Sequence, residues 1–137
     1  MLSSANTPLH CESHDADFTM VAYCELLMLA KINYFFATYE DIPWGQRFVL
    51  WRHDCDYSLN RAFALAQAEF DRGVRATYFV NPHSEFYNLF EASQHRLVSK
   101  IVRMGHHIGL HFDAAFHVVS DAAQLSSLVR EIGRAHV

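Results

Sequence analysis

Apolar and polar positions follow two different periods along the chain. From about Asp17 to Asn33 apolar residues recur at three- and four-residue intervals, which predicts a helix with one apolar face. Further helices are predicted over 58–72, 93–104 and 120–130, while short apolar runs predict strands over 48–51, 76–80 and 107–112. The apolar positions of the first helix are Val21, Cys24, Met28, Leu29 and Ile32.

Helix boundary signals support these assignments. Ser58 is the predicted N-cap of the second helix, and Gly73 and Gly105 stop the second and third helices. The turn sequence Ile42-Pro43-Trp44-Gly45 separates the first helix from the first predicted strand.

The alternation of strands and helices predicts an α/β fold. Consecutive strand–helix–strand units are right-handed and place parallel strands in one sheet with helices outside it. Three strands cannot close a barrel, which leaves either a small open sheet or a larger (β/α) barrel that is cut short. We expect the truncated barrel. We expect residues 1–15 to be a disordered tail and residues 16–130 to form a partial domain. Residues 131–137, EIGRAHV, match the translated opening of a common sequencing adapter, and we expect them to be an artefact.

Composition narrows the function. A chain of 137 residues with 51% hydrophobic residues can bury one core, and 15 acidic against 11 basic residues leave no basic run for nucleic acid. Three cysteines without CxxC spacing indicate a reducing compartment, and a start without a secretory leader favours the cytoplasm. The apolar window from Phe18 to Phe36 contains Glu25 and Lys31, which argues against a membrane span. Oligomeric state is left open.

Each predicted strand ends in a polar cluster. The clusters are residues 52–56 (RHDCD), 81–83 (NPH) and 111–113 (HFD). Because active sites of parallel α/β folds lie at the carboxyl ends of the strands, one site explains all three clusters.

Asp54 and Asp56 are expected to point the same way, with α-carbons roughly 6 to 7 Å apart. Two carboxylates so close favour a bound cation, although Asp56 could instead cap the following helix. His111 arrives from another strand end, and imidazole with carboxylate is a common ligand set for zinc, iron or cobalt. His107, roughly 13 Å back along the strand, is expected to be structural.

The segments RHDCDYS, ATYFVN, FYN and MGHHIGLHFD together resemble the opening half of the polysaccharide deacetylase family, in its RHD-x-D subgroup. The resemblance covers about Phe18 to Phe116. It implies a metal-dependent hydrolase, with zinc the expected metal, that removes N-acetyl groups from a sugar or glycan. Asp54 would be the catalytic base, and Asp56 and His111 metal ligands.

Two family positions differ, and one of them is His107, which stands where the family often has Glu. The second metal histidine of the family falls at Ala115, so Asp113, His117 or water would have to replace it. The later family motifs lie beyond the sequence, and we expect the 137-residue chain to release no acetate. Carbohydrate contacts are expected from Arg52 and from the loop residues His83, Tyr87 and Asn88. We also expect Arg52 to orient Asp54 or Asp56 by a charge-assisted hydrogen bond.

Two rival functions stay open. The DxDxS sequence after a strand resembles the nucleophile motif of haloacid-dehalogenase-type phosphatases, in which Asp54 would attack phosphorus with Mg²⁺ bound. That hypothesis leaves His111 without a role. The substitution at Ala115 also allows a degenerate deacetylase-like module that binds glycan without turnover.

Overall fold

The computed structural model describes residues 18–113 and 116–135. Predictions on residues 1–15, Ala115 and residues 136–137 lie outside the described residues. The elements in chain order are α1 (Met20–Asn33), β1 (Phe35–Ala37), β2 (Phe48–Leu50), β3 (Arg52–Cys55), α2 (Leu59–Phe70), β4 (Thr77–Val80), α3 (Ala92–Arg103), β5 (His107–Leu110) and α4 (Ala122–Ala135).

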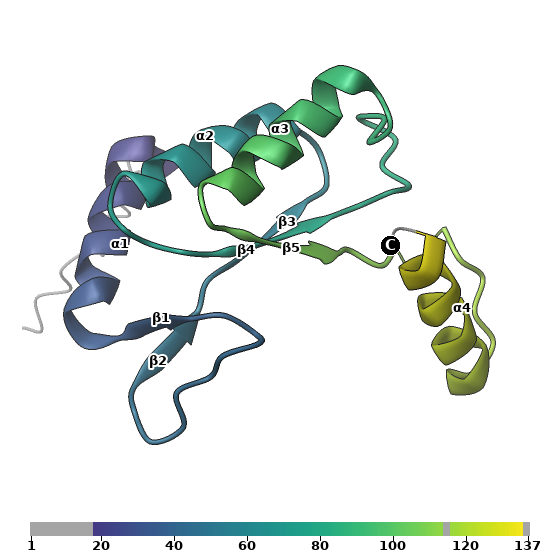
Figure 1. Ribbon diagram of the computed structural model, residues 1–137, viewed down its shortest axis with the longest axis horizontal. Helices are drawn as coiled ribbons and strands as arrows, with labels where there is room; N and C mark the ends of the chain where they lie inside the picture. The colour runs from purple at the N-terminus through teal and green to yellow at the C-terminus, as the bar shows by residue number, and fades with distance from the viewer. Residues whose placement is uncertain (1–17, 114–115, 136–137) are drawn as a thin grey trace, which may run out of the picture.

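The described strands form two parallel sheets. Strands β3, β4 and β5 form one sheet in that order, and β1 pairs with β2 in a second sheet. Helices α2 and α3 lie side by side on one face of the larger sheet (Figure 1). The predicted α/β architecture with parallel strands is therefore confirmed. Neither described sheet closes into a barrel.

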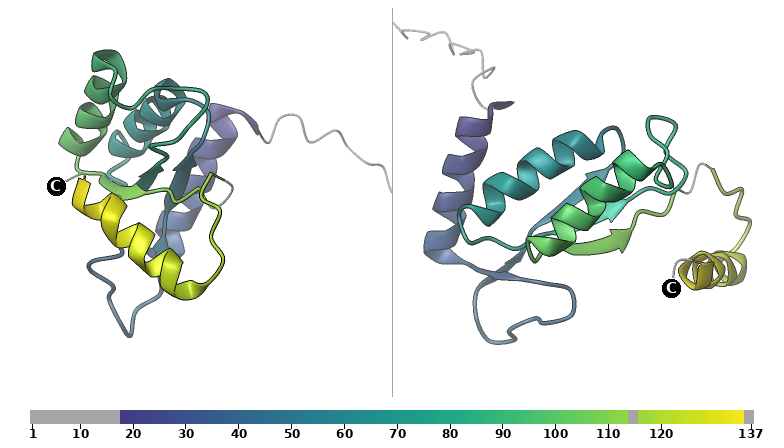
Figure 2. Two further views of the ribbon diagram at one scale, coloured as in Figure 1. Left: turned by 90° about the vertical axis from the view of Figure 1, so that its right-hand side faces the viewer. Right: turned by 45° about the horizontal axis from the view of Figure 1, so that its top comes forward.

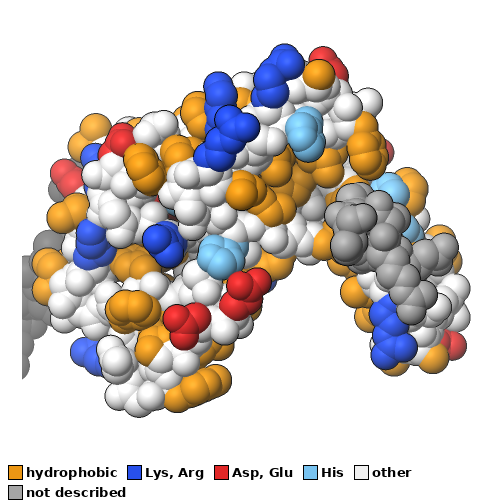
Figure 3. All heavy atoms as spheres, in the orientation of Figure 1, with side chains coloured by type: hydrophobic (Ala, Val, Ile, Leu, Met, Phe, Trp, Pro, Cys, Tyr) orange, Lys and Arg blue, Asp and Glu red, His pale blue; other side chains and the backbone are white. Residues whose placement is uncertain are grey.

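Helix α4 departs from the expected layer of outer helices. Figure 1 and the right view of Figure 2 show it set apart from α2 and α3, beyond the end of the larger sheet. In the space-filling view the molecule is arched, with α4 on one side of the hollow and the β1–β2 region on the other (Figure 3). Among the described residues, no layer of helices covers the second face of the larger sheet.

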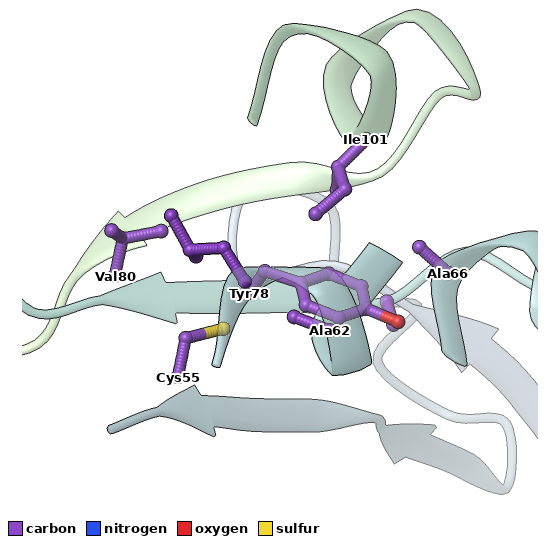
Figure 4. Packing of buried hydrophobic residues seen from close by; sticks show 8 residues of the cluster. Cys55, Ala62, Ala66, Tyr78, Val80 and Ile101 are labelled. Atoms are coloured by element: carbon purple, nitrogen blue, oxygen red, sulfur yellow. The ribbon is translucent and has the colours of Figure 1, made fainter. Parts of the chain in front are cut away.

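The core lies between the larger sheet and its two helices. Tyr78 and Ile101 are fully buried there, and Ala62 and Ala66 let α2 approach the strands closely (Figure 4). Burying a side chain the size of Ile101 contributes about 1.5–3 kcal/mol to stability. This packing holds β3, β4 and β5 in register, so that their carboxyl ends are adjacent.

A buried carboxylate ties the core to its neighbours. Glu69 on α2 has no exposed surface, and it accepts hydrogen bonds from the hydroxyls of Tyr23 and Tyr78. The Nε2 atom of His53 lies 2.5 Å from its Oε1 atom. Burial opposes the charge of Glu69, but the hydrogen bonds from His53 and the two tyrosines outweigh burial and lower its pKa. Glu69 therefore joins α1, β3 and β4 through one charged group.

Burial also lowers the pKa of His106, which lies next to this network. Its Nδ1 atom accepts a hydrogen bond from the backbone N–H of Ala76, and its Nε2 atom is 2.9 Å from the carbonyl oxygen of Ala66. The donor at Ala76 and the acceptor at Ala66 fit one neutral tautomer, protonated on Nε2. His106 is thus a structural histidine.

The predicted helix near the N-terminus forms, but most of the apolar positions that predicted it are not buried. Leu27 is its buried residue, whereas Val21, Met28, Leu29 and Ile32 are each at least half exposed. Most positions around α1 are apolar, so their spacing alone does not show which face packs against the rest of the protein. The hydrogen bond from the Trp51 indole to the Tyr23 hydroxyl turns the Tyr23 side of the helix inward. None of the helices in the described part of the chain is long and apolar enough to cross a membrane.

On the face of the sheet away from α2 and α3, Gly109 lies beneath the ring of Phe79. A Cβ atom at Gly109 would meet the Cε1 atom of Phe79 at 2.6 Å. The ring cannot move aside freely, because the Arg52 guanidinium lies 4.3 Å from its centroid and Tyr39 packs against its edge. Position 109 therefore requires glycine, because the Phe79 ring leaves no room for a side chain there.

We expect Gly109→Ala to lower the free energy of unfolding by about 1–3 kcal/mol through this overpacking. Urea denaturation measures the change. In a Phe79→Ala background the ring is absent, so the same substitution should cost much less. Equal costs in the two backgrounds would contradict this explanation.

Candidate metal and ligand site

An open pocket of about 710 Å³ lies at the carboxyl ends of β3, β4 and β5. The loop after β3 contributes Asp56 and Tyr57, and the loop after β4 contributes residues between 81 and 86. The segment after β5 contributes His111, Asp113 and Phe116. All three polar clusters that were predicted to converge therefore border one pocket.

Asp56 and His111 meet in this pocket. The Asp56 Oδ1 atom lies 2.7 Å from the His111 Nδ1 atom. Nδ1 is buried and forms no hydrogen bond with the residues that the structure describes. Carboxylate and imidazole groups can both bind a divalent cation, and at this separation they can also form an ion pair.

Asp56 has no capping role that would explain its position. The N-cap of α2 is Ser58, as predicted, and its hydroxyl accepts from the Arg61 N–H at 3.3 Å. The backbone carbonyl of Asp56 accepts a hydrogen bond from the Ser84 hydroxyl at 2.8 Å. The turn that carries Asp56 is thus held by its main chain, and the carboxylate faces the pocket.

Asp54 lies on β3 and does not line the pocket that contains Asp56 and His111. Its carboxylate accepts a hydrogen bond from the Arg52 guanidinium at 2.5 Å, and this bond is the main cause of the raised pKa of Arg52. Asp54 and Asp56 both line a smaller pocket of about 220 Å³. The predicted pairing of Arg52 with one of the two aspartates is therefore observed, with Asp54 as the partner.

Two further predicted ligands, Asp113 and His117, follow β5. Asp113 lines the larger pocket, and its carboxylate accepts from the backbone N–H of Phe116 at 3.2 Å. The Nε2 atom of His117 is buried without a hydrogen-bond partner, and its ring stacks 5.1 Å from that of Phe112. Within the described residues, no three His, Cys, Asp or Glu side chains are arranged to hold one ion. Of the four predicted ligands, Asp56 and His111 are the two that the structure brings into contact.

The predicted sugar-contact residues divide into two groups. His83 lines the larger pocket, where its ring stacks on Phe116. The Tyr87 hydroxyl instead donates to the Cys55 carbonyl at 2.5 Å and accepts from the Asn81 N–H at 3.1 Å. Asn88 accepts from the N–H of Phe90 within its own turn. Tyr87 and Asn88 therefore order the loop after β4.

His107 is separated from this site along β5. Its Nδ1 atom lies 3.8 Å from Glu40, and it lines a different pocket, of about 580 Å³, together with Lys31 and Arg75. This placement agrees with the expectation that His107 and His111 do not share an ion.

Sequence reasoning missed three aromatic residues of the site. Tyr57, Phe86 and Phe116 all line the larger pocket, and all are more than half exposed. Their positions in the sequence could have indicated this role, because each lies in a loop next to or close to a predicted polar site residue. Aromatic residues in such loops point to a binding surface more often than those within strands do.

Comparison with known proteins gives no assignment. The chain matches no protein-family model, no curated protein and no solved structure. The function must therefore be argued from the site itself.

Proposed function

We propose that the chain carries the metal-binding part of a hydrolase of the polysaccharide deacetylase type, which removes N-acetyl groups from a sugar or glycan. The contact between Asp56 and His111 at 2.7 Å carries this proposal. The two residues are 55 positions apart in the sequence, and they meet at the strand ends where α/β enzymes place their chemistry. The resemblance assigned the same two residues to the metal.

Asp56 and His111 would hold a divalent transition metal, with zinc expected because imidazole and carboxylate are both common zinc ligands. When bound, such an ion supplies a water of lowered pKa. Asp113 borders the same pocket, and the buried Nε2 atom of His117 lacks a partner. These two residues are the candidates for completing the ligand set in place of the histidine that Ala115 replaces.

Asp54 is the proposed general base. Asp54 is on β3, two residues before Asp56 in the sequence, and both residues border the 220 Å³ pocket. The hydrogen bond from Arg52 fixes the orientation of the Asp54 carboxylate. Arg52 itself is held over the ring of Phe79 at 4.3 Å. In this proposal Arg52 acts through Asp54 as a positioning residue.

Metal binding is the first test. We expect the metal-free chain to bind one Zn²⁺ or Co²⁺ per molecule in isothermal titration calorimetry, with Mg²⁺ bound much more weakly. Saturation at 100 times the dissociation constant should stabilise the fold by about 2.7 kcal/mol. Preference for Mg²⁺, with phosphate released from a phosphate ester, would instead favour the phosphatase alternative.

A second candidate is a glycan-binding module without turnover. It is favoured by one observation: a third ligand is not assembled with Asp56 and His111 in the described part of the chain. This module would bind oligosaccharide in the presence of EDTA and retain no zinc after dialysis. The hydrolase proposal predicts retained metal, so the two candidates give opposite results in one metal analysis.

A further inference from the structure

Three exposed aromatic rings border the pocket that contains Asp56 and His111. The exposed fractions are 70% for Tyr57, 63% for Phe86 and 58% for Phe116. Tyr57 and Phe86 pack against each other with ring centroids 4.8 Å apart. Phe116 stacks on His83 at 4.0 Å. Two aromatic pairs, contributed by the loops after all three strands, therefore border a single pocket.

These pairs are not part of the hydrophobic core. The core cluster lies between the sheet and helices α2 and α3, and Tyr57 and Phe86 lie outside it. Isolated exposed aromatic residues are ordinary, but three around one polar pocket form a surface on which a ligand can stack. Ser84 and Asn81 border the same pocket and offer hydroxyl and amide groups. Apolar ring faces beside hydrogen-bonding groups match a pyranose, which has an apolar C–H face and a hydroxyl edge.

The charge of the pocket selects among such ligands. Its lining contains the carboxylates Asp56, Glu85 and Asp113, and no Lys or Arg among its described residues. A bound divalent cation would still leave one excess negative charge. An anionic group on the ligand, such as a phosphate, sulfate or carboxylate, would lie next to these carboxylates and would find no Lys or Arg of the described lining to pair with. Like charges across a contact are unfavourable.

We propose that this pocket selects neutral or amino-bearing pyranose rings over anionic ones, and that Tyr57 and Phe86 form the platform on which the sugar stacks. The proposal rests on the proposed function for the class of ligand. To that function it adds two statements: the ligand carries no negative charge, and Tyr57 and Phe86 bind it. The ring pair itself is independent of the metal, so the two proposals can fail separately.

The test is a binding titration of the whole chain followed by ¹H–¹⁵N NMR. The probes are triacetylchitotriose, which is neutral, and trigalacturonate, which carries three carboxylates. Both are titrated once with EDTA and once with Zn²⁺ present. We expect triacetylchitotriose to bind in both conditions and to shift the signals of residues 56–57 and 83–86, with trigalacturonate at least tenfold weaker.

Variants test the platform. Phe86→Ala and Phe86→Leu should each weaken triacetylchitotriose binding at least tenfold, since leucine keeps apolar volume but lacks the ring. Phe90→Ala is the matched control, because Phe90 is a 77% exposed phenylalanine of the same loop that does not line the pocket. Equal binding of the two probes, or Phe86→Leu binding as tightly as the wild type, would overturn the proposal. Zinc binding without any sugar binding would overturn it and leave the metal site intact.

Discussion

Replacing Glu69 with alanine should lower the free energy of unfolding by about 3–5 kcal/mol. The substitution removes the acceptor shared by Tyr23 and Tyr78 and leaves His53 without its carboxylate partner. Each of these donors is buried or half-buried and would lose its hydrogen bond without gaining full access to water. Chemical denaturation measures the loss, and a change below about 1 kcal/mol would contradict the central role given to this network.

Glu25→Ala is the matched control, because Glu25 is an exposed acidic residue of α1. It should change stability by no more than about 0.5 kcal/mol. If Glu69→Ala does not fold, Glu69→Gln provides the measurement, because the amide oxygen can still accept from one tyrosine.

The pH dependence of stability gives a second readout of Glu69. The lowered pKa means that the folded state holds the Glu69 carboxylate ionised when the unfolded chain already binds a proton. Stability from this group is complete above the ordinary value of 4.5 and is lost as the pH falls from there through the folded-state pKa. In Glu69→Gln this part of the acid destabilisation should be absent. An unchanged acid limb would show that the carboxylate is not the responsible group.

Replacing His111 with alanine should weaken Zn²⁺ binding by roughly 100-fold or more, because loss of even an outer partner of a metal site costs about 10–100-fold. Asp56→Asn should have a similar effect, since the amide lacks the charge that the carboxylate brings to the ion. The 2.7 Å contact between the two side chains is the reason to expect both effects. Calorimetric titration of each purified variant gives the dissociation constants.

Two controls separate ligands from neighbours. Asp54→Asn should keep wild-type zinc affinity within a few-fold, because Asp54 is proposed to hold a proton and is paired with Arg52. His95→Ala, at an exposed histidine of α3, should have no effect. Loss of zinc binding in Asp54→Asn with retention in Asp56→Asn would reverse the proposed roles of the two aspartates.

Much of the fold could be predicted because its signals are local. Ser58 caps α2 as expected, and Gly73 and Gly105 follow the ends of their helices with positive φ angles. The parallel order of β3, β4 and β5 followed from the spacing of strands and helices. These features depend on residues that are close together in the sequence, so the pattern of apolar, polar and glycine positions predicts them.

The strands before Arg52 were predicted less well, because their limits depend on tertiary pairing. The apolar run 48–51 was expected to be one strand next to the polar cluster. In the structure β2 ends at Leu50 and pairs with β1, a strand that was not predicted, whereas β3 begins at Arg52 and pairs with β4. Trp51 separates the two strands, and no local signal marks that change of partner.

In the candidate site too, some contacts could be predicted from the sequence and others could not. Each predicted strand was expected to end in a polar cluster at one edge of the sheet, and the contact between Asp56 and His111 agrees with that prediction. The structural role of the Tyr87 hydroxyl could not be predicted from the sequence. Its partners are the backbone carbonyl of Cys55 and the backbone N–H of Asn81, at the ends of two strands. Contacts to backbone atoms leave no mark in the identity of the partner residue.

The most direct test of the central claim is the ¹⁵N NMR spectrum of the histidine side chains during a Zn²⁺ titration. We predict that the Nδ1 resonance of His111 moves to a metal-bound position at one equivalent of Zn²⁺, and that this change is lost in Asp56→Asn. An unchanged His111 ring in a chain that binds zinc through other residues would contradict a metal site built on Asp56 and His111.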